Sequence, residues 1–436
     1  MTTGQQAGHR RTLAEWVDRI EAMHPQDIAL GLDRIGAVKE RLSITFSCPV
    51  VIVGGTNGKG STCMMLETIW RTAGYRVGQY TSPHIHRFNE RIRIDGQMVD
   101  DDALIGAFEA VEAVRGDVPL TFFEFTTLVA MKLFVDAGLD VVVLEVGLGG
   151  RFDAVNLLDA DVAIVTNVDL DHQAFLGDTR EEIGFEKAGI FRRGRVALYG
   201  EVDPPQSLLD HAAAIGADLK RYGRDYEGKS DGKTWHYRGL DGTALWELPL
   251  PSLYGDCQVV NAATVLTAVY VLRDRLPVYI ETFSEALPHI QLPGRFEVIQ
   301  HNPLVIVDVS HNPHAARTLA GNLASLPCKG RTLAVYGAMA DKDIDGVVRI
   351  LKDQIDEWYI TNLPLPRAAT VDVLLEKLLA AGIPRERITV CEEAEKALDS
   401  ARKNASNDDR ITAFGSFWVV TGVTPPDCCQ ESSNHQ

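Results

Sequence analysis

The chain has 436 residues, with 60 Asp and Glu against 43 Lys and Arg, which gives a formal net charge of −17. That balance argues against a general nucleic-acid binder, because phosphate backbones are met by clustered Lys and Arg. The seven Cys show no metal-ligand or disulfide spacing, the first residues lack the apolar core of a signal peptide, and no long apolar run occurs. We therefore expect a soluble, cytoplasmic protein with reduced cysteines and no nucleic-acid or membrane partner, and the length favours two domains.

A glycine-rich stretch with a single lysine occupies residues 53–62, between an apolar run at 49–53 and a helical pattern at 61–73. In a strand, loop and helix of this kind, the glycines let successive amides and the start of the helix face a phosphate. Lys59 would add a positive charge near the β- and γ-phosphates. The stretch therefore predicts that the protein binds ATP.

This stretch differs from the common phosphate-loop pattern at two positions. Val53 stands where the first glycine belongs, and Gly60 separates Lys59 from the hydroxyl of Ser61. An ordinary glycine turn of an α/β fold would explain the glycines alone. It would leave the full run at 57–61 unexplained, so we favour the phosphate loop.

After this loop, helical patterns alternate with strand-like runs. The helical patterns lie near 100–115 and 122–137, and the strand-like runs lie at 140–146 and 161–166. Such alternation is typical of βαβ units and a parallel sheet. Residues 222–257 then change to short alternating pieces with Gly, Asp, Trp and Tyr, which predict a small antiparallel sheet, and a helical pattern follows at 258–273.

The Leu-Pro-Gly-Arg sequence at 292–295 is typical of a linker. We place the domain boundary there, with an ATP-binding domain at 1–293 and a smaller domain at 294–436. Strand-like runs restart in the second part, at 304–308, 332–336, 358–361 and 388–391. The sequence thus predicts an α/β fold with two domains, an N-terminal P-loop ATPase-type domain with a mostly parallel sheet flanked by helices and a smaller C-terminal Rossmann-like domain. We expect the tail at 424–436 to be frayed.

Glu145 lies at the end of the strand-like run at 140–146, and a glycine-rich loop leads from it to Asp153. In an open parallel sheet, ligands gather at the carboxyl ends of the strands, which is where a Mg²⁺ bridging ATP oxygens would lie. An ion-paired strand end is the structural alternative. The glycines that follow Glu145 favour a ligand site.

A second polar cluster, at 167–172, follows the strand-like run at 161–166. A single His is more often a structural hydrogen-bonding residue than a ligand, but His172 would lie at the same sheet edge as Glu145. We predict that His172 binds a second metal ion and that Asp171 orients its imidazole.

Two further segments are ambiguous by residue type alone. Lys187 is expected to be an unremarkable surface residue. The cluster at 308–314 follows the first strand-like run of the second domain, and its polar residues are suited to cap a helix that begins at Pro313. Alternatively, its Asp, His and Asn would together hold an incoming ribose or amine.

Taken together, these segments resemble the Mur ligase superfamily and, within it, the folylpolyglutamate synthase and dihydrofolate synthase family, most closely its bifunctional bacterial members. The resemblance extends over most of the chain. It rests on residues 55–62, 81–84, 88–91, 121–124, 145–153, 170–172, 186–191, 292–295 and 308–313. Several of these segments are weak alone, but their combination is highly specific.

The resemblance implies two Mg²⁺ ions, one held by Ser82 and Glu145 and the other shared by Glu145 and His172. It also implies that Lys187 is carbamylated, which overrides the surface role expected from its residue type. The residues expected to bind ATP are Thr56, Asn57, Gly58, Lys59, Gly60 and Ser61 of the loop and, by resemblance, Asn261, Arg295 and Asp308. The residues expected to act in catalysis are Lys59, Lys187, His172, Arg91, His311 and Ser416, of which Arg91, His311 and Ser416 match positions linked with the glutamate substrate.

The resemblance also implies a pterin site. Its expected residues are Ile28, Ala29, Leu30, Thr121, Phe122, Phe123, Glu124, Arg151, Phe152, Asp153, Ala154 and Val155. The sequence departs from the bifunctional members here, because Ala29 stands in place of an aspartate, and Phe152 and Val155 replace a leucine and a threonine. Trp418 is a further departure, since it follows the family's Gly-Ser-Phe sequence at 415–417.

The implied activity is that of an ADP-forming acid–amino-acid ligase. It would join L-glutamate to dihydropteroate, giving dihydrofolate, and to the glutamate tail of reduced folates, through an acyl phosphate. Three alternatives stay open: a folylpolyglutamate synthase alone, another Mur-type ligase that adds an amino acid to a cell-wall precursor or another carboxylate, and a nucleotide-binding regulator without catalysis. We expect small-molecule substrates, a monomer, and closure of the two domains when ATP binds.

Overall fold

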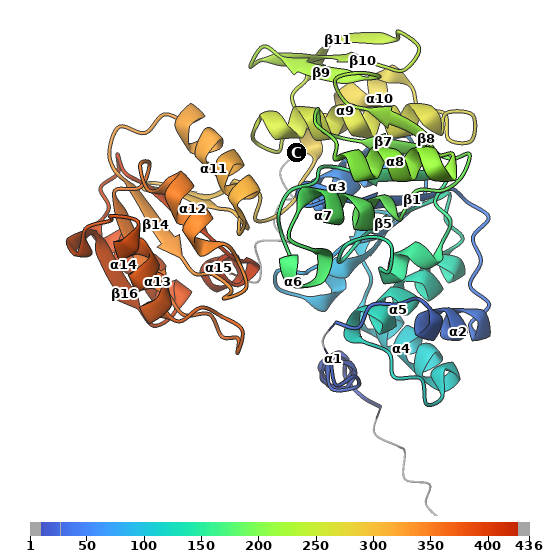
Figure 1. Cartoon of the computed structure of the whole chain (residues 1–436), viewed down its shortest axis with the longest axis horizontal. Helices are drawn as coiled ribbons and strands as arrows, with labels where there is room; N and C mark the ends of the chain where they lie inside the picture. Colours follow the sequence, from blue (N-terminus) through green and yellow to red (C-terminus); the bar gives the residue numbers. More distant parts are fainter. Residues whose placement is uncertain (1–9, 27, 426–436) are drawn as a thin grey trace, which may run out of the picture.

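The computed structural model describes residues 10–26 and 28–425 and shows two α/β domains lying side by side (Figure 1). Each domain is built on a sheet of its own, as the sequence predicts. Most of the tail that is expected to fray lies outside the described residues. Within the described ranges, no helix is both long enough and apolar enough to cross a membrane.

The larger sheet is parallel except at one edge. Its strands lie in the order β4 (Gln97–Met98), β3 (Ile92–Ile94), β2 (Val77–Tyr80), β5 (Val141–Glu145), β1 (Val50–Gly54), β6 (Val162–Val165), β7 (Val196–Tyr199) and β8 (Asp218–Arg221). Only β3 and β4 run antiparallel to their neighbours. Strands β1, β5 and β6 are buried along their whole length, which explains why their sequences are continuous apolar runs.

Helices cover both faces of this sheet. Because side chains alternate along a strand, Val50 and Ile52 of β1 face one layer while Val51 and Val53 face the other. The first layer contains α1 (Leu13–Glu21), α2 (Asp33–Arg41), α4 (Asp101–Arg115), α5 (Phe122–Ala137), α7 (Arg180–Ala188) and α8 (Gln206–Ile215). The second contains α3 (Lys59–Thr72), α9 (Asp256–Val271) and α10 (Ile280–Ala286).

A small antiparallel sheet packs on α9, at the top of Figure 1, and confirms the prediction for 222–257. Its strands lie in the order β11 (Ala244–Pro249), β10 (Thr234–Arg238) and β9 (Glu227–Ser230). Trp235 and Tyr237 of β10 are buried in the same core as α9, and the Tyr237 hydroxyl lies 2.8 Å from Thr267 Oγ1. This sheet therefore extends the core on the α3 side.

The second domain has the layered arrangement expected of a Rossmann-like domain. Its strands lie in the order β12 (Glu297–His301), β13 (Leu304–Val307), β17 (Arg410–Phe414), β14 (Thr332–Tyr336), β15 (Glu357–Thr361) and β16 (Ile388–Cys391). Helices α11 (Pro313–Ser325), α12 (Ile344–Leu351) and α13 (Val371–Ala380) cover one face, and α14 (Ala394–Asn404) and α15 (Phe417–Val423) cover the other. All pairs are parallel except β12 with β13.

The structure corrects the predicted strands of this domain in two places. The run at 304–308 is not the first strand, because β12 precedes it as a partly exposed edge strand with a weak apolar pattern. Strand β17 is missing from the prediction although it lies inside the sheet. Two polar residues in buried positions, Arg410 and Thr412, interrupt its apolar run.

The coil between the short 3-10 helix η3 (Leu287–His289) and β12 joins the two domains and contains the sequence 292–295. The domain boundary at residue 293 stays a prediction. The described cysteines are all free: Cys48, Cys63, Cys257, Cys328 and Cys391.

Candidate active site

The glycine-rich loop leads from β1 into α3, which begins at Lys59, two residues before the predicted start. Gly58 caps the helix with φ 81°, a left-handed conformation that favours glycine. Gly55 has φ 137°, and a Cβ added to it would lie 1.8 Å from Thr166 Oγ1 of the neighbouring segment. The loop therefore requires glycine at both positions.

The segment after β6 fixes this loop through hydrogen bonds. The Thr56 amide donates to Asn167 O at 3.0 Å, and the Asn57 amide donates to Asn167 Oδ1 at 3.0 Å. The first helical bond is Thr62 N to Gly58 O at 2.9 Å. The amides of the first turn of α3, at 59–61, therefore remain as the donors that face an anion at the helix start.

Lys59 folds back over the loop. Its ammonium donates to the carbonyls of Gly55 and Thr56, both at 3.1 Å. This places a positive charge on the loop that leads into the helix start. The loop can thus bind a polyphosphate, with the charge and the amides acting together.

Glu145 ends β5, beside β1, and is buried. One carboxylate oxygen accepts from the Ser82 amide at 2.9 Å, so the structure brings Glu145 to the backbone of Ser82, and the Mg²⁺ that the two would share stays a prediction. Burial raises the pKa of Glu145, although Lys59 and the Ser82 amide act in the opposite direction. The carboxylate also lies next to the loop, because a Cβ atom added to Gly60 would be only 4.0 Å from Glu145 Oε1. Glu145 and the loop therefore lie at the same edge of the sheet.

The predicted nucleotide residues outside the loop approach it from two other elements. A Cβ on Gly58 would lie 3.0 Å from Asn261 Oδ1 on α9, and a Cβ on Gly60 would lie 3.9 Å from Arg295 Nη2. Asp308 follows β13 and is bound by the Phe296 amide at 2.8 Å and by the Ser310 amide at 2.8 Å. The structure brings Asn261 and Arg295 to the loop, while the Asp308 carboxylate already holds the backbone of its own domain.

The fit to a metal ion depends on the donor atoms that are present. Among the residues that the structure describes, no group of three or more His, Cys, Asp or Glu side chains is placed to hold a metal. Mg²⁺ commonly uses one or two protein carboxylates and takes its remaining oxygens from phosphate and water. The buried Glu145 carboxylate next to the phosphate loop fits such a site.

His172 is the N-cap of the short helix α6 (Gln173–Leu176) and has φ 52°. Burial lowers the pKa of His172 to about 4, so its imidazole is neutral at pH 7, the form that binds metals. Its Nε2 lies 3.9 Å from Asp171 Oδ2, beyond hydrogen-bonding distance. The prediction that Asp171 orients this imidazole is therefore wrong.

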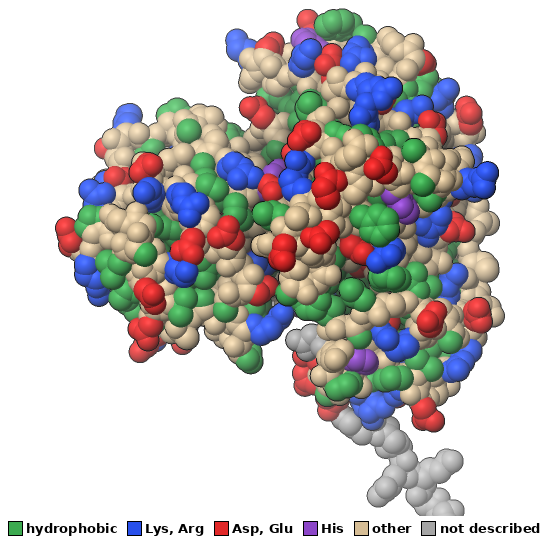
Figure 2. Space-filling view, in the orientation of Figure 1, with side chains coloured by type: hydrophobic (Ala, Val, Ile, Leu, Met, Phe, Trp, Pro, Cys, Tyr) green, Lys and Arg blue, Asp and Glu red, His purple; other side chains and the backbone are tan. Residues whose placement is uncertain are grey.

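Asp171 instead binds the second domain. Lys342 Nζ donates to its Oδ1 at 2.5 Å, Asn312 Nδ2 donates to its Oδ2 at 2.9 Å, and His311 Nε2 lies 3.4 Å from Oδ2. Burial acts to raise the pKa of Asp171, but His311 and Lys342 prevail and hold it well below its usual range. Figure 2 shows basic, acidic and His side chains meeting along this junction.

Asn312 has two roles at once. Its Oδ1 accepts from the Ala315 amide at 2.9 Å and caps α11, with Pro313 in the first turn. Its side chain also exchanges two hydrogen bonds of 3.1 Å with the side chain of Asn57 in the phosphate loop. The predicted helix cap is therefore present, and the binding of a ribose or amine by the Asp, His and Asn of this cluster stays a prediction.

Lys187 lies at the end of α7 and is buried, contrary to the surface role expected from its residue type. Burial, with the nearby charge of Lys59, lowers the pKa of Lys187 to about 7, although Asp171 and Asp153 act in the opposite direction. At neutral pH a large share of its amine is therefore uncharged. An uncharged amine is the form that reacts with CO₂.

Arg91 closes the short 3-10 helix η1 (Phe88–Arg91) and is also buried. Its Nε donates to His84 Nδ1 at 2.8 Å, and its guanidinium lies 5.2 Å from the centre of the Phe122 ring. Burial and the charge of Arg91 lower the pKa of His84 to about 4. Arg91 is thus a fixed positive charge close to one of the predicted pterin segments.

Ser416, the last predicted catalytic residue, lies after β17 and is buried. Its hydroxyl accepts from the Trp418 amide at 3.2 Å and caps α15. The ring of Phe417 lies 5.2 Å from the guanidinium of Arg295, which connects this helix start to the nucleotide side of the site.

The predicted pterin residues 28–30 and 121–124 lie next to each other. Thr121 and Glu124 form a capping box at the start of α5. Arg34 of α2 donates to Glu124 Oε1 at 3.0 Å and to the Ala29 carbonyl at 2.6 Å. Arg34 therefore holds the segment that contains Ala29 against α5.

The two phenylalanines of this segment contact other residues near the site. Phe122 packs on Arg91, and the ring of Phe123 lies 5.8 Å from that of Tyr80.

The other predicted pterin residues form the loop after β5 and the 3-10 helix η2 (Ala154–Leu157). Asp153 caps η2, and its carboxylate accepts from the Leu148 amide at 2.8 Å and the Val155 amide at 3.1 Å. Burial raises the pKa of Asp153 to about 7. Arg151 Nη2 pairs with Glu186 Oε1 at 2.6 Å, and its guanidinium lies 4.3 Å from the ring centre of Phe152, which is exposed. Ala154 and Val155 are buried in the core of this layer.

Three basic residues around the site are missing from the sequence prediction: Arg34, Lys342 and Arg367. Lys342 lies in an Asp-Lys-Asp sequence six residues after β14 ends at Tyr336, so it lacks the signal of polar residues directly after a strand that identified the segments of Glu145 and His172. The capping-box pattern at 121–124 was visible in the sequence and would have suggested that Glu124 is bound internally.

The fold and the site together define an ATP-dependent ligase of the Mur type. Residues 53–269 match the Mur ligase middle domain, and residues 294–417 match the Mur ligase glutamate ligase domain. An Escherichia coli (strain K12) protein named dihydrofolate synthase/folylpolyglutamate synthase is 44% identical to this chain over 412 residues, which cover 94% of each chain. The chain belongs to the dihydrofolate synthase/folylpolyglutamate synthase family.

Solved structures agree with this placement. A structure titled E. coli FolC in complex with DHPP and ADP has a TM-score of 0.89 and 43% identity and covers 97% of this chain and 98% of its own. The Yersinia pestis bifunctional folylpolyglutamate synthase/dihydrofolate synthase complexed with AMPPNP and Mn has a TM-score of 0.87 and 43% identity, with the same coverage. The predicted two-domain α/β fold, the family resemblance and the acid–amino-acid ligase class are confirmed.

Proposed function

We propose that the chain uses ATP to join the amine of L-glutamate to dihydropteroate and to the glutamate tail of reduced folates. The observation that supports this best is the convergence of the open helix start at 59–61, Lys59 and buried Glu145 beside a junction of two domains. The solved relatives named above are complexes with ADP, AMPPNP, DHPP and Mn. Their ligands are of the kinds that this site would hold.

In this proposal, an oxygen of the acceptor carboxylate attacks the γ-phosphorus of ATP, and ADP leaves. The neutral amine of glutamate then attacks the acyl carbon of the acyl phosphate, the bond to the phosphate oxygen breaks, and the amine loses its proton. The loop amides and Lys59 hold the phosphates and offset the charge that builds on the transferred group. Most of the rate comes from alignment of the two substrates.

Two Mg²⁺ ions, when bound, would supply charge neutralisation at the phosphates, with Ser82 and Glu145 holding one and Glu145 and His172 the other. Asn261, Arg295 and Asp308 are proposed to hold the nucleotide from α9 and the second domain. His311, Ser416 and Arg91 are proposed to act on the glutamate side. The monomeric state and the domain boundary stay predictions.

Lys187 is proposed to be carbamylated, and its pKa of about 7 gives a pH dependence. Below that pKa the amine is protonated and unreactive, so at fixed dissolved CO₂ we expect carbamate formation to be roughly tenfold faster at pH 8 than at pH 6. The reaction is followed by the carbamate resonance in ¹³C NMR with labelled bicarbonate. The resonance should vanish in Lys187→Met and persist in Lys229→Met, which removes an exposed lysine; a resonance unaffected by Lys187→Met would contradict the assignment.

The proposed pterin site depends on the contact of Arg34 with Glu124 and the Ala29 carbonyl. We expect Arg34→Met to raise the KM for dihydropteroate about tenfold, since it removes two charge-assisted hydrogen bonds that hold this segment. The KM for ATP should not change. Arg19→Met, which breaks an Arg–Glu pair away from the site, is the matched control. A dihydropteroate KM within twofold of the wild-type value would count against this role.

Ligation itself is tested with Mg²⁺, ATP and L-glutamate by following phosphate release and identifying the products by mass. One reaction contains dihydropteroate and the other tetrahydrofolate. Products in both establish the two activities. Products with tetrahydrofolate alone would support a folylpolyglutamate synthase. That outcome would connect Ala29, Phe152 and Val155 with the loss of the pterin reaction. No product in either reaction would favour a Mur-type ligase for another substrate.

A further inference from the structure

His314, in the first turn of α11, contacts two residues of the first domain. Its Nδ1 lies 2.9 Å from Asn57 Nδ2 in the phosphate loop, and its Nε2 lies 3.5 Å from Glu201 Oε1, shortly after β7. The His314 side chain is 22% exposed, so most of it is removed from water at the junction of the two domains. His314 therefore connects the second domain to the phosphate loop.

A chain of hydrogen bonds determines which His314 nitrogen carries the proton. The Ala315 amide can only donate, so its partner on Asn312 is the oxygen Oδ1, and Asn312 Nδ2 in turn donates to Asn57 Oδ1 at 3.1 Å. The Nδ2 atom of Asn57 is then the donor in its contact with His314. His314 Nδ1 must accept this bond, which leaves the ring proton on Nε2, the nitrogen that faces Glu201.

Every polar group of Asn57 has a partner in the protein. Its backbone amide donates to Asn167 Oδ1 at 3.0 Å, and its carbonyl accepts from Asn167 Nδ2 at 3.0 Å and from Thr166 Oγ1 at 2.6 Å. Its side-chain amide is bound by Asn312 and His314 of the second domain. The side chain of Asn57 is thus a contact between the domains, whereas the neighbouring amides at 59–61 are the donors that face an anion.

A second contact attaches α11 to the same loop. Arg317, three residues after His314, donates through Nη2 to Asp169 Oδ2 at 2.5 Å. The backbone of Asp169 in turn binds Thr56 Oγ1, since its carbonyl accepts at 3.1 Å and its amide donates at 3.0 Å. Thr56 directly precedes Asn57. A change at His314 should therefore alter the alignment of α11 with the loop without detaching the helix.

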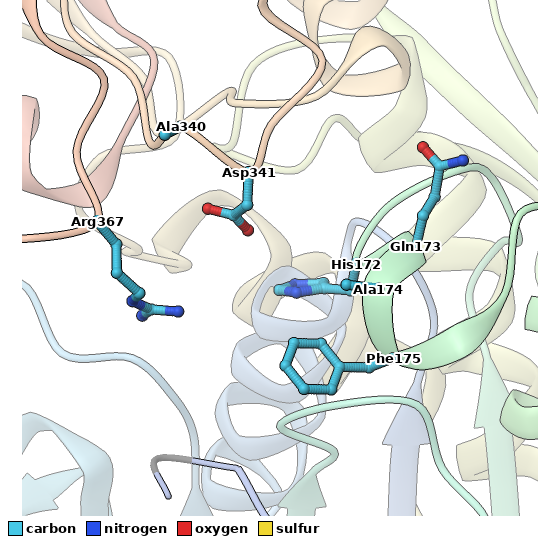
Figure 3. A pocket seen from close by; sticks show the side chains of 7 residues that line it. All are labelled: His172, Gln173, Ala174, Phe175, Ala340, Asp341 and Arg367. Atoms are coloured by element: carbon cyan, nitrogen blue, oxygen red, sulfur yellow. The ribbon is translucent and has the colours of Figure 1, made fainter.

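Part of the junction between the domains is not packed. A cavity of about 400 Å³ separates α6 and its N-cap from two loops of the second domain. Figure 3 shows His172 on one side of this space and Arg367 on the other. Individual side-chain contacts, such as that of His314 with Asn57, must therefore determine how the second domain lies on the first.

We propose that His314 is a positioning residue for the ligation: by holding Asn57, it keeps the phosphate loop aligned with the second domain. This inference rests on the proposed function, in which the loop holds the phosphoryl donor and the second domain contributes groups on the glutamate side. The reactants then meet only if the two domains are aligned, and a misplacement of about 1 Å costs a factor of about a hundred in rate. In this role His314 acts through Asn57 and not on a reactant.

The test begins with His314→Leu in the ligation assay. This change removes the acceptor and leaves a donor of Asn57 unpaired, so we expect kcat to fall roughly 10- to 100-fold. The KM for ATP should stay within about threefold, since Lys59 and the loop amides are retained. The matched control is His301→Leu, which removes an exposed histidine of β12 in the same domain and should leave kcat unchanged. A kcat of His314→Leu within about twofold of the wild-type value would overturn the inference.

Two amide substitutions separate the contact with Asn57 from a general loss of packing. His314→Asn places an oxygen near the position of Nδ1, so it should restore kcat to within about threefold of the wild-type value. His314→Gln places its amide near the position of Nε2, facing Glu201, and should resemble His314→Leu. Recovery in His314→Gln alone would assign the effect to Glu201 and contradict the inference, and so would a loss that neither amide restores.

A measurement without substrates distinguishes this inference from the proposed function. Hydrogen exchange of the loop at 53–62 should be about threefold faster or more in His314→Leu, and unchanged in His314→Asn and His301→Leu. If the wild-type chain forms no glutamate adduct with either acceptor, the proposed function fails. If it forms adducts and His314→Leu retains both the kcat and the exchange of the loop, the ligase stands and the positioning role of His314 fails.

Discussion

We expect Lys59→Met to lower kcat by about three orders of magnitude, because a single pre-positioned cation on a transferred phosphoryl group contributes on that scale. The ammonium donates to two carbonyls of the phosphate loop at 3.1 Å, just before the start of α3. Methionine is a good helix former, so the start of α3 should be retained. The change therefore removes the charge and leaves the amides in place.

The measurement is ADP formation in the presence of both substrates, with the thermal midpoint as a check of folding. Lys229→Met removes a lysine that is exposed on the small sheet and should leave kcat unchanged. A loss of less than tenfold in Lys59→Met, with the fold intact, would show that the loop amides and other cations provide most of the stabilisation.

Lys342→Met should weaken the junction of the two domains by about 3 kcal/mol or more, because it leaves the Asp171 carboxylate buried without its cation. The two side chains are only 9% and 8% exposed, and their contact is 2.5 Å. Because Lys342 and Asp171 belong to different domains, the cost should appear as opening of the junction. We expect a larger radius of gyration in solution scattering and a fall in kcat of about a hundredfold.

Lys377→Met is the matched control, since it breaks a Lys–Asp pair of the same domain whose side chains are 38% and 48% exposed. Such an exposed pair contributes about 0–1 kcal/mol, so scattering and kcat should match those of the wild-type chain. The double variant with Asp171→Asn completes a double-mutant cycle. Additive losses in that cycle would mean that Lys342 does not act through Asp171.

The sequence predicted the central part of the fold well for a physical reason. Strands β1, β5 and β6 are buried on both faces, and their short apolar runs are therefore unambiguous. Strand β17 is as deeply buried but was not predicted, because Arg410 starts it. The guanidinium of Arg410 is accommodated by the carbonyls of Leu323 at 2.8 Å and Leu326 at 3.0 Å, which belong to a helix end far away in the sequence.

The residues of the site also divide into those that a local pattern could place and those that only the tertiary fold brings together. Lys59 and Glu145 follow neighbouring parallel strands, so the rule that strand ends share an edge was sufficient to bring them together. Lys342 could not be placed in this way. It meets Asp171 only because the second domain docks in one orientation, and no local pattern in either domain determines that orientation. Arg34 is a similar case, since its contact with Glu124 spans 90 positions of the sequence.

The side chain of Asn312 joins the rigid start of α11 to the phosphate loop and to Asp171 at a single point. Helix α11 has 13 residues and is therefore about 20 Å long. The first turn of α11 is held at this point, and the other end of the helix lies far from it. A rotation of the second domain of about ten degrees around this point would move the far end of α11 by roughly 3 Å.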